Sequence, residues 1–267
     1  MLETLVIVPT YNERDNLPLI IERILAASPH TDVLVVDDNS PDGTGLLADE
    51  LAAQHPEVNV LHRAVKDGLG GAYLAGFRWG LDKGYWALVE MDADGSHHPE
   101  ELPRMIELLA GHDLVMGSRW VPGGQVENWP LQRKILSKGG NLYTRIALGI
   151  DVRDATGGYR VFSADALRRI NLDGVASQGY CFQVDLLWRA LQVGLRVVET
   201  PITFTERIHG VSKMSGNIVS ESLLRVTRWG IRRRARALVG YITPAEKLPS
   251  VRARYHRALP GIERQPS

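Results

Sequence analysis

Two short apolar runs near the N-terminus constrain the fold more than any other feature of the sequence. Leu5–Val8 and Val33–Val36 are continuous apolar runs bounded by polar turns, a pattern typical of parallel strands buried on both faces. Between them, residues 16–27 carry Leu and Ile at helical spacing. The N-terminal segment therefore predicts a strand–helix–strand unit.

The alternation of strands and helices continues along most of the chain. We expect further helices at 44–54, 71–83, 99–109, 131–148 and 182–193, and strands at 58–62, 114–117 and 196–205, with another strand that ends at Asp92. The Gly- and Pro-rich segment 121–130 predicts a mobile loop. Strands that alternate with helices predict an α/β fold with a mostly parallel, doubly wound sheet.

Composition indicates a soluble globular chain with an ample core. Of its 267 residues, 44% are hydrophobic and 23% charged, which argues against disorder. Thirty-one basic and thirty-one acidic residues cancel, so the overall charge favours no particular partner. The single cysteine, Cys181, excludes an internal disulfide and suits a reducing compartment, where we expect a buried, inert thiol. We expect no signal peptide and no membrane span, since charges interrupt every apolar stretch.

An acidic turn follows the apolar run from Tyr85 to Met91. Asp92 and Asp94 are separated by one residue, and a helix restarts at Pro99. Ligands of open α/β sheets collect at the carboxyl ends of the strands, where two carboxylates offer hard oxygen ligands to Mg²⁺ or Mn²⁺. Taken alone, an Asp-x-Asp pair is more often a helix cap beside a solvated acid.

Two more acidic clusters follow the first two strands. Glu13 follows the first, and Asp37, Asp38 and Asp42 follow the second, so all three clusters are predicted at one edge of the sheet. Singly, Glu13 is a plausible first-turn acid and Asp42 belongs to an ordinary turn. Their convergence favours a site for a nucleotide and a metal. The glycines at 68–71 lack the Walker lysine–serine pair and the dinucleotide spacing, and close packing of a helix on the sheet explains them better.

A series of ordered blocks carries a family resemblance from about residue 4 to residue 217. The blocks are residues 8–13, 36–44, 68–70, 91–99, 117–119, 133–139, 154–160 and 179–183. Together they resemble the inverting family 2 glycosyltransferases with a GT-A fold, specifically the dolichyl- or polyprenyl-phosphate mannose synthases.

The resemblance implies roles for matching residues. The residues implied at the guanosine are Pro9, Tyr11, Glu13, Val36 and Asp38, and those implied at the diphosphate and its Mg²⁺ or Mn²⁺ are Asp92, Ala93 and Asp94, with both aspartates as metal ligands. The residues implied in phosphate handling and catalysis are Arg119, Arg133, Arg207 and Lys213. Some relatives have glutamine in place of Ser96, which is a shorter and weaker ligand. Several relatives also carry C-terminal membrane helices, which this sequence lacks.

The predicted chemistry needs cations more than a base. A lipid monophosphate is largely ionised near neutral pH because its second pKa is about 6. Cations must hold two anionic reactants together and stabilise charge on the departing diphosphate. Asp185 is a candidate base, but orienting an arginine is the better explanation. His97 and His98 suggest a metal or acid role, although capping a helix or lining a loop is commoner for adjacent histidines.

A basic helix is predicted at 217–241. Arg225, Arg228, Arg232 and Arg236 fall on one face and apolar residues on another, and no acid lies between 222 and 241. It could bind an anionic membrane, pack on its own domain with a solvated arginine face, or bind nucleic acid, although no nucleic-acid motif accompanies it. We therefore divide the chain into a catalytic domain at 1–214, this helix at 215–241, and a poorly ordered tail at 242–267.

These inferences combine into one hypothesis with two rivals. The chain is expected to transfer mannose from GDP-mannose to a polyprenyl monophosphate with inversion, peripherally on the cytoplasmic face of a membrane. Direct lipid contact or a separate membrane-anchoring protein would hold it there, and no nucleic-acid partner is expected. The rivals are a UDP-glucose-dependent polyprenyl-phosphate glucosyltransferase and a catalytically silent nucleotide-binding module. The presence of the expected aspartates and cations speaks against the silent module.

Overall fold

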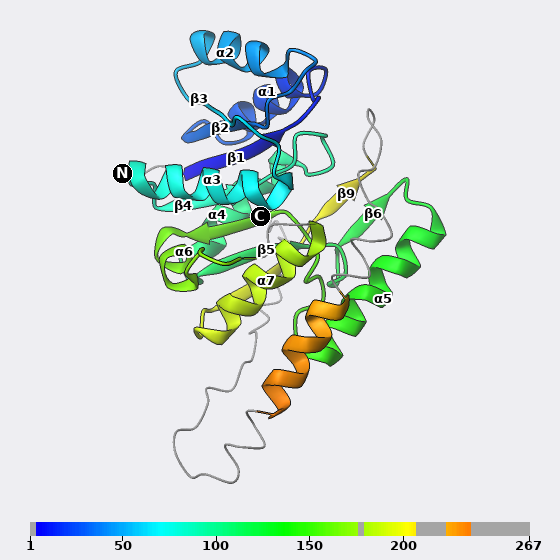
Figure 1. Ribbon diagram of the computed structural model, residues 1–267. Coiled ribbons are helices and arrows are strands. Elements are labelled where there is room, and N and C mark those ends of the chain that lie inside the picture. Colours follow the sequence, from blue (N-terminus) through cyan, green and yellow to red (C-terminus); the bar gives the residue numbers. More distant parts are fainter. Residues whose placement is uncertain (1–3, 176–178, 207–222, 236–267) are drawn as a thin grey trace, which may run out of the picture.

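A computed structural model describes residues 4–175, 179–206 and 223–235 (Figure 1). Its strands are β1 (Thr4–Thr10), β2 (Thr31–Asp37), β3 (Val58–His62), β4 (Ala87–Glu90), β5 (Leu114–Ser118), β6 (Gln125–Glu127), β7 (Arg160–Ser163), β8 (Val197–Pro201) and β9 (Thr203–Thr205). Its named helices are α1 (Leu17–Ala27), α2 (Thr44–Gln54), α3 (Gly68–Lys83), the 3₁₀ turn η1 (Pro99–Glu101), α4 (Leu102–Leu109), α5 (Leu131–Leu148), α6 (Ala164–Ile170) and α7 (Gly179–Gln192).

The main sheet has seven strands in the order β3-β2-β1-β4-β7-β5-β8. Every neighbouring pair is parallel except the two pairs that β7 makes with β4 and β5. A second, two-stranded sheet pairs β6 with β9. The predicted mostly parallel α/β fold is confirmed, with one antiparallel strand inserted near the middle of the sheet.

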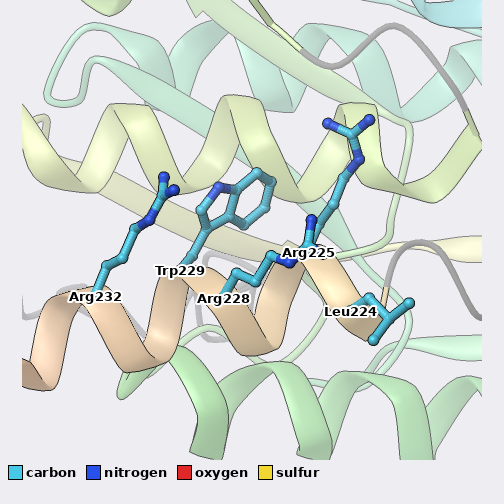
Figure 2. A pocket seen from close by; sticks show the side chains of 5 residues that line it. All are labelled: Leu224, Arg225, Arg228, Trp229 and Arg232. Atoms are coloured by element: carbon cyan, nitrogen blue, oxygen red, sulfur yellow. The ribbon is translucent and has the colours of Figure 1, made fainter.

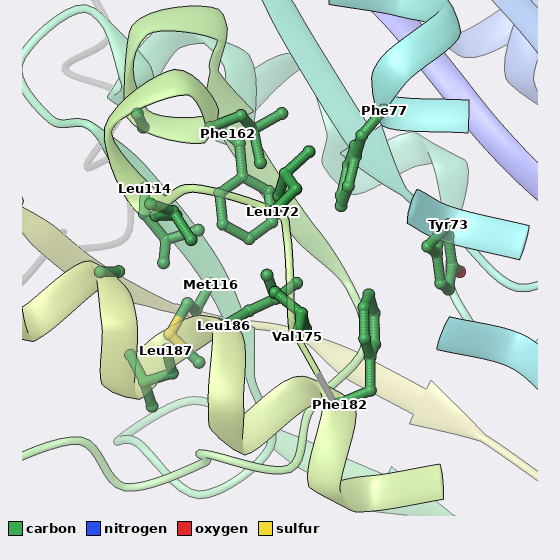
Figure 3. Packing of buried hydrophobic residues seen from close by; sticks show 14 of the residues in the cluster. Tyr73, Phe77, Leu114, Met116, Phe162, Leu172, Val175, Phe182, Leu186 and Leu187 are labelled. Atoms are coloured by element: carbon green, nitrogen blue, oxygen red, sulfur yellow. The ribbon is translucent and has the colours of Figure 1, made fainter. Parts of the chain in front are cut away.

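Helices cover both faces of the main sheet. On one face, α3, α6 and α7 pack through a cluster in which Tyr73 stacks on Phe182 with ring centroids 6.0 Å apart (Figure 3). On the other face, α1 and α4 pack against alternate residues of the same strands. Because both faces are covered, Leu5, Val6, Ile7 and Val8 of β1 are all fully buried.

Two glycines let α3 approach the sheet closely. A Cβ at Gly76 would lie 2.6 Å from Cγ2 of Ile7, and a Cβ at Gly80 would lie 2.6 Å from Cδ2 of Leu88. A methyl group has no room at either position. The expected close packing of this helix on the sheet is therefore present, but at glycines one to three turns beyond the 68–71 segment.

The observed elements differ from the predicted ones in several places. The predicted loop at 121–130 contains β6. The predicted strand at 196–205 is two strands, β8 and β9. Between them, the backbone N–H of buried Ile202 donates to the Ser118 carbonyl at 3.1 Å, and β9 then pairs with β6 instead of the main sheet. Strand β7 and helix α6 were not predicted at all. The α3 and α7 helices each begin three residues earlier than expected.

The C-terminal helix is described over residues 223–235, and the rest of the predicted 217–241 helix lies outside the described residues. It lies beside α5 (Figure 1), where Arg234 donates to the Ile146 carbonyl at 2.9 Å and the Tyr143 and Thr227 hydroxyls hydrogen-bond each other. Val226 on this helix is buried against the core. Within the described ranges, no helix is long and apolar enough to cross a membrane.

Candidate active site

Loops after three adjacent strands form one edge of the site. The Thr10 hydroxyl, at the end of β1, donates to Asp37 at the end of β2 at 3.0 Å. The next turn along the chain is tied down in the same way, since the Glu13 backbone N–H donates to the Thr44 hydroxyl at 3.0 Å. Strand β4 lies on the other side of β1, so its acidic turn is at the same edge. The predicted convergence of the three acidic clusters is therefore observed.

The residues predicted at the nucleoside have different environments. Pro9, Tyr11 and Glu13 are half-buried, and the Lys66 ammonium lies 3.5 Å from the centroid of the Tyr11 ring. Asp38 is buried and forms an ion pair with Arg63 at 2.5 Å; its burial raises the pKa of the carboxyl, and Arg63 partly offsets this rise. The Val36 side chain lies wholly inside the core, so only its backbone could face a nucleotide.

The two-aspartate turn is fixed by hydrogen bonds at both acids. Asp92 accepts from the Tyr73 hydroxyl at 3.0 Å, and its backbone N–H donates to Nδ1 of His97 at 3.1 Å. Asp94 accepts from the Ser96 backbone N–H at 3.1 Å, and Gly95 between them has φ +74°, which a glycine adopts without strain. Both carboxylates are half-buried, with Ala93 buried between them. The turn therefore presents two held carboxylates rather than two solvated ones.

His97 supports this turn from inside the protein. Its ring is buried, stacks on Tyr159 at 5.0 Å and meets Phe204 edge-on at 5.4 Å. Burial lowers the pKa of His97, with Asp92 and Asp94 opposing the shift. A neutral ring suits the observed role of Nδ1 as an acceptor. His97 thus supports the acidic turn, while His98, just before η1, makes no side-chain cap and hydrogen-bonds the Thr205 hydroxyl at 2.9 Å.

A buried contact between a glutamate and an arginine joins strand β4, which precedes this turn, to the 154–160 block. Glu90 of β4 pairs in register with Arg160 of β7, with Nε of the arginine 3.9 Å from a carboxylate oxygen. Burial raises the pKa of Glu90 to about 8, and Arg160 opposes the rise. Arg160 also donates to the carbonyls of Gly157, Gln183 and Ala155 at 2.8–2.9 Å. This arginine therefore anchors residues from three segments below the site.

The turn suits a hard divalent cation. Asp92 and Asp94 supply carboxylate oxygens, the ligands that Mg²⁺ and Mn²⁺ prefer. The Ser96 hydroxyl is buried and has no hydrogen-bond partner within the described ranges. The same ranges hold no cluster of three or more Asp, Glu, His or Cys side chains that could bind a metal. A cation held here would therefore take its remaining ligands from a bound diphosphate and from water.

Arg119 follows β5 and is buried in an ion pair with Asp154. Its Nε and Nη2 donate to the two carboxylate oxygens at 2.7 and 2.6 Å, and its backbone N–H donates to the same carboxylate at 2.9 Å. Burial alone would raise the pKa of Asp154, but the Arg119 guanidinium outweighs it and holds that pKa below the ordinary value. Arg119 is thus a fixed cation within the protein rather than a mobile surface charge.

An aromatic cluster brings Arg133 to Arg119. The Arg119 guanidinium lies 5.3 Å from the centroid of Trp129 and 5.4 Å from that of Phe204, and the Arg133 guanidinium lies 4.1 Å from Trp129. Arg133 also pairs with Glu206, just after β9. Phe204 contacts His97 as well, so one cluster joins the two-aspartate turn to both arginines.

Buried donors near these arginines have no acceptor in the described part of the chain. They are Nε1 of Trp120, Nε1 of Trp129 and the Ser137 hydroxyl. Buried polar groups are normally hydrogen-bonded, so donors of this kind fit a site that receives an anion.

The remaining predicted residues are placed as follows. Arg207 and Lys213 lie outside the described residues. Asp185 on α7 accepts from Nε of Arg189 at 2.9 Å, which confirms that it orients an arginine. Cys181 is a buried thiol, as expected.

Sequence reasoning did not single out four residues that shape the site. Asp154 and Tyr159 lie in the 154–160 block, which was used for the resemblance but given no role. Trp129 was assigned to a loop, and Phe204 to the last two residues of a predicted strand at 196–205. Their roles depend on contacts between distant segments, which periodicity does not reveal.

The fold and the acidic turn define a class of protein. An open sheet that gathers three acidic loops at its carboxyl edge, one of them a two-aspartate turn, is the GT-A architecture of glycosyltransferases. A match to the family model described as "Glycosyl transferase family 2" spans residues 5–170, and the chain belongs to this family.

Two relatives match most of the chain at 59% and 60% identity. The chain is 59% identical over 230 residues to an undecaprenyl-phosphate mannosyltransferase of Micrococcus luteus, covering 86% of this chain and 95% of that protein. It is 60% identical over 233 residues to a polyprenol monophosphomannose synthase of Mycolicibacterium smegmatis, covering 86% and 88%.

Solved structures share the fold at low identity. A mannosyltransferase from Pyrobaculum calidifontis in complex with GDP-mannose and Mn²⁺ matches with a TM-score of 0.53 at 18% identity, covering 92% of this chain and 76% of that one. Glucosyl-3-phosphoglycerate synthase from Mycobacterium tuberculosis, with Mn²⁺ and UDP among its ligands, matches with a TM-score of 0.58 at 18% identity, covering 86% and 79%.

Proposed function

We propose that this family 2 glycosyltransferase transfers mannose from GDP-mannose to a polyprenyl monophosphate with inversion at the sugar carbon. The observation that carries the proposal is the placement of Arg119 and Arg133 against one indole ring, Trp129, which the Phe204–His97 contacts link to the two-aspartate turn. This arrangement suits a reaction between two phosphate-bearing substrates. The names of the relatives at about 60% identity support mannose as the sugar and a polyprenyl phosphate as the acceptor.

The donor half of the proposal rests on the carboxyl edge of β1, β2 and β4. Half-buried Tyr11 and Glu13, and Asp38 beside Arg63, offer a ring and carboxylates to a nucleoside. Asp92 and Asp94 would hold a divalent cation, which would supply positive charge to the leaving diphosphate. The assignment of guanosine as the nucleoside comes from the family resemblance.

The acceptor half rests on the arginines and the unpartnered donors. Arginine's planar fork suits phosphate, and the indole Nε1 of Trp120 and of Trp129 lack protein acceptors among the described residues. An acceptor phosphate would supply the missing acceptor oxygens. Because its second pKa is about 6, the phosphate is already largely ionised near neutral pH and needs no strong base. This fits Asp185, which is paired with Arg189 rather than free to take a proton.

The reaction then follows from positioning and charge. An oxygen of the acceptor phosphate attacks the anomeric carbon as the bond from that carbon to the diphosphate breaks, and GDP departs with the bonding electrons. Arg119 is held rigidly by Asp154, so its charge needs little reorganisation as negative charge shifts between the two phosphates. We place the reaction peripherally on the cytoplasmic face of a membrane, because a polyprenyl chain partitions into lipid.

A donor and acceptor panel tests this function. Labelled GDP-mannose and UDP-glucose are incubated with the protein, Mg²⁺ or Mn²⁺, and a water-soluble short-chain polyprenyl phosphate. We expect lipid-linked mannose from GDP-mannose, with loss of product when the metal is chelated. Product from UDP-glucose alone would replace the donor assignment, and nucleotide binding without product from either donor would favour the silent module.

A further inference from the structure

The loop between β3 and α3, residues 63–67, borders the proposed nucleoside site. β3 pairs with β2 at one side of the main sheet, with His62 in register with Asp37, so this loop leaves the sheet at the same carboxyl edge as the acidic loops. The backbone N–H of Arg63 donates to the Asp37 carbonyl at 2.8 Å, which extends the pairing of the two strands by one residue. The fold therefore brings the loop to the end of β2, next to the end of β1.

Arg63 fixes the loop against Asp38. Its Nη1 donates to the Asp38 carboxylate at 2.5 Å, in a pair whose side chains are only 17% and 6% exposed. Its Nη2 faces the first turn of α3, since a Cβ at Gly71 would lie 3.1 Å from it. Burial raises the pKa of Asp38, and Arg63 and the Asp67 backbone, both hydrogen-bonded to this carboxylate, oppose the rise. Both ends of the loop are thus tied to one buried carboxylate.

Lys66, between these two anchors, extends over Tyr11. Its ammonium lies 3.5 Å from the centroid of the Tyr11 ring, within the range of a cation–π interaction. Lys66 is exposed to solvent, and Tyr11 is half-buried in the loop that follows β1. An exposed cation on a fixed loop therefore lies on the ring that is proposed to contact the nucleoside.

A lysine in this position can distinguish nucleobases. Its three N–H donors on a flexible stem can move from the face of the ring to the edge of a bound base. Guanine presents two neighbouring acceptors on that edge, O6 and N7, whereas adenine presents N7 beside an amino donor at N6. Uracil, like thymine, has a single acceptor there, O4. An ammonium group therefore favours guanine and opposes the amino group of adenine.

We propose that Lys66 is a specificity-determining residue that selects guanine in the nucleotide-sugar donor. The base packs on Tyr11, and the Lys66 ammonium moves from the ring to donate to O6 and N7 of the guanine. Arg63 is a positioning residue that holds the loop against Asp38. The inference rests on the proposed function, because it takes the nucleoside to lie at Tyr11 and Asp38. The alternative is a surface lysine that rests on a tyrosine and attracts any nucleotide through its charge.

Nucleotide binding by the full chain tests this role without any sugar transfer. Calorimetry in the presence of Mn²⁺ gives the dissociation constants of GDP, IDP, ADP and UDP for wild type, Lys66→Met and Lys66→Arg. IDP carries an oxo group at position 6 of the purine where ADP carries an amino group, so their comparison isolates the contact proposed for Lys66. Methionine keeps an unbranched stem and removes the charge, whereas arginine can still donate to both O6 and N7.

Lys83→Met is the matched control. Lys83 also lies over an aromatic ring, 5.5 Å from the centroid of Trp79, but in the last turn of α3. This variant should bind all four nucleotides like wild type. An effect as large as that of Lys66→Met would mean that any lysine lost from α3 or its preceding loop weakens binding, and would overturn the specific role of Lys66.

A second control examines another place where nucleotide phosphates could bind. Arginines on the helix at 223–235 line a cavity of about 310 Å³ (Figure 2), whose lining residues are Leu224, Arg225, Arg228, Trp229 and Arg232. Guanidinium groups suit phosphate whatever the base. Arg225→Gln/Arg228→Gln/Arg232→Gln should leave GDP affinity unchanged, and loss of GDP binding in this variant would place the nucleotide in the cavity and overturn the inference.

Lys66→Met should weaken the binding of GDP and IDP on the order of tenfold or more, the loss expected for a two-point contact to the guanine edge. ADP should weaken by less than roughly threefold, because it loses only a contact at N7. The preference of the wild type for IDP over ADP should therefore largely disappear, and Lys66→Arg should retain it. In turnover, Lys66→Met should raise KM for GDP-mannose with kcat nearly unchanged, because the base is held equally in the ground and transition states.

The same measurements separate this inference from the proposed function. Equal losses for IDP and ADP in Lys66→Met would make Lys66 a general attraction for nucleotides and overturn its role in base selection. Unchanged GDP affinity would overturn that role as well and leave the proposed mannosyl transfer standing. Tighter wild-type binding of UDP than of GDP would overturn the guanosine assignment, and this inference with it. The expected response of Lys66→Met in a protein that transfers no sugar would instead overturn the proposed function alone.

Discussion

Asp94 is held by the turn but does not contribute to the core. Its carboxylate is half-buried and accepts one backbone hydrogen bond, from Ser96. We therefore expect Asp94→Asn to fold normally and to lose most metal-dependent turnover, because an amide is a far weaker ligand for Mg²⁺ or Mn²⁺ than a carboxylate. Thermal unfolding and product formation across a metal titration measure the two effects.

Asp82→Asn is the control for that experiment, since Asp82 is an exposed acid on α3. It should change neither quantity. Near-normal activity of Asp94→Asn at the metal concentration that saturates the wild type would remove Asp94 from the metal site.

Asp154 should dominate the response of the site to acid. Asp154→Asn leaves the buried Arg119 guanidinium without a countercharge, a change that costs about 3 to 5 kcal/mol of unfolding free energy. Because the folded-state pKa of Asp154 is lowered, the carboxylate stabilises the fold fully above its unfolded pKa of about 3.9, and this stabilisation is lost as the pH falls through the folded-state pKa. The difference between wild type and variant should therefore be largest at neutral pH and shrink in acid.

Denaturant unfolding at a series of pH values measures this difference. Asp151→Asn is the control, because its ion pair with Arg145 is on the surface and is worth about 0 to 1 kcal/mol. A gap between wild type and Asp154→Asn that stays constant from neutral pH to below pH 3 would contradict the assignment.

Among single residues, the sequence predicted the positions of those that lie directly after a predicted strand. Asp92 and Asp94 follow directly from a strand that stops at an acidic turn, so their place at the sheet edge could be predicted. The partners of Arg119 could not, because Asp154 is 35 residues away in sequence and reaches it through the turn before β7. Whether Arg207 and Lys213 join them remains a prediction from the resemblance.

Among the elements, α3 shows how close packing positions the site. It carries Tyr73, which bonds Asp92, and it packs against β1 and β4 through Gly76 and Gly80. Gly76→Ala should destabilise the fold by about 1 to 3 kcal/mol, because overpacking against Ile7 outweighs the better helix propensity of alanine.

Denaturant unfolding tests this against Gly111→Ala as a matched change. A Cβ at Gly111 would meet nothing within 4 Å, and its φ is not positive, so that variant should be within about 0.5 kcal/mol of wild type. Equal stabilities for the two variants would mean that the helix shifts freely away from the sheet.

The elements predicted to the residue have local signals near their ends, such as Gly43 before α2 and Pro130 and Gly149 on either side of α5. α2, β3 and α5 have the predicted bounds. β6 and β9 were missed or merged because each is three residues long and is defined only by pairing with the other. β7 begins with Arg160, a charged residue that reads as a loop until its buried partners are known.

For the whole molecule, α5 carries two different kinds of side chain on different sides. One side of the helix carries Arg133, which stacks on Trp129 in the site, and another carries exposed Leu and Ile side chains. Substitutions on the two sides should therefore have separable effects. The neutral net charge of the chain gave no indication that α5 has four Arg and Lys residues and no acid.

Arg133→Ala should lower turnover on every acceptor, whether dissolved or embedded in vesicles. Removing a preorganised charge costs on the order of 2 to 4 kcal/mol of transition-state stabilisation, or roughly 30- to 1,000-fold in kcat/KM. Thermal stability should change little, because the Arg133–Glu206 pair is partly exposed. If Arg133→Ala instead keeps the wild-type rate on the water-soluble acceptor, Arg133 is a helix-surface residue, and Arg119 alone among the described arginines is left to bind the acceptor phosphate.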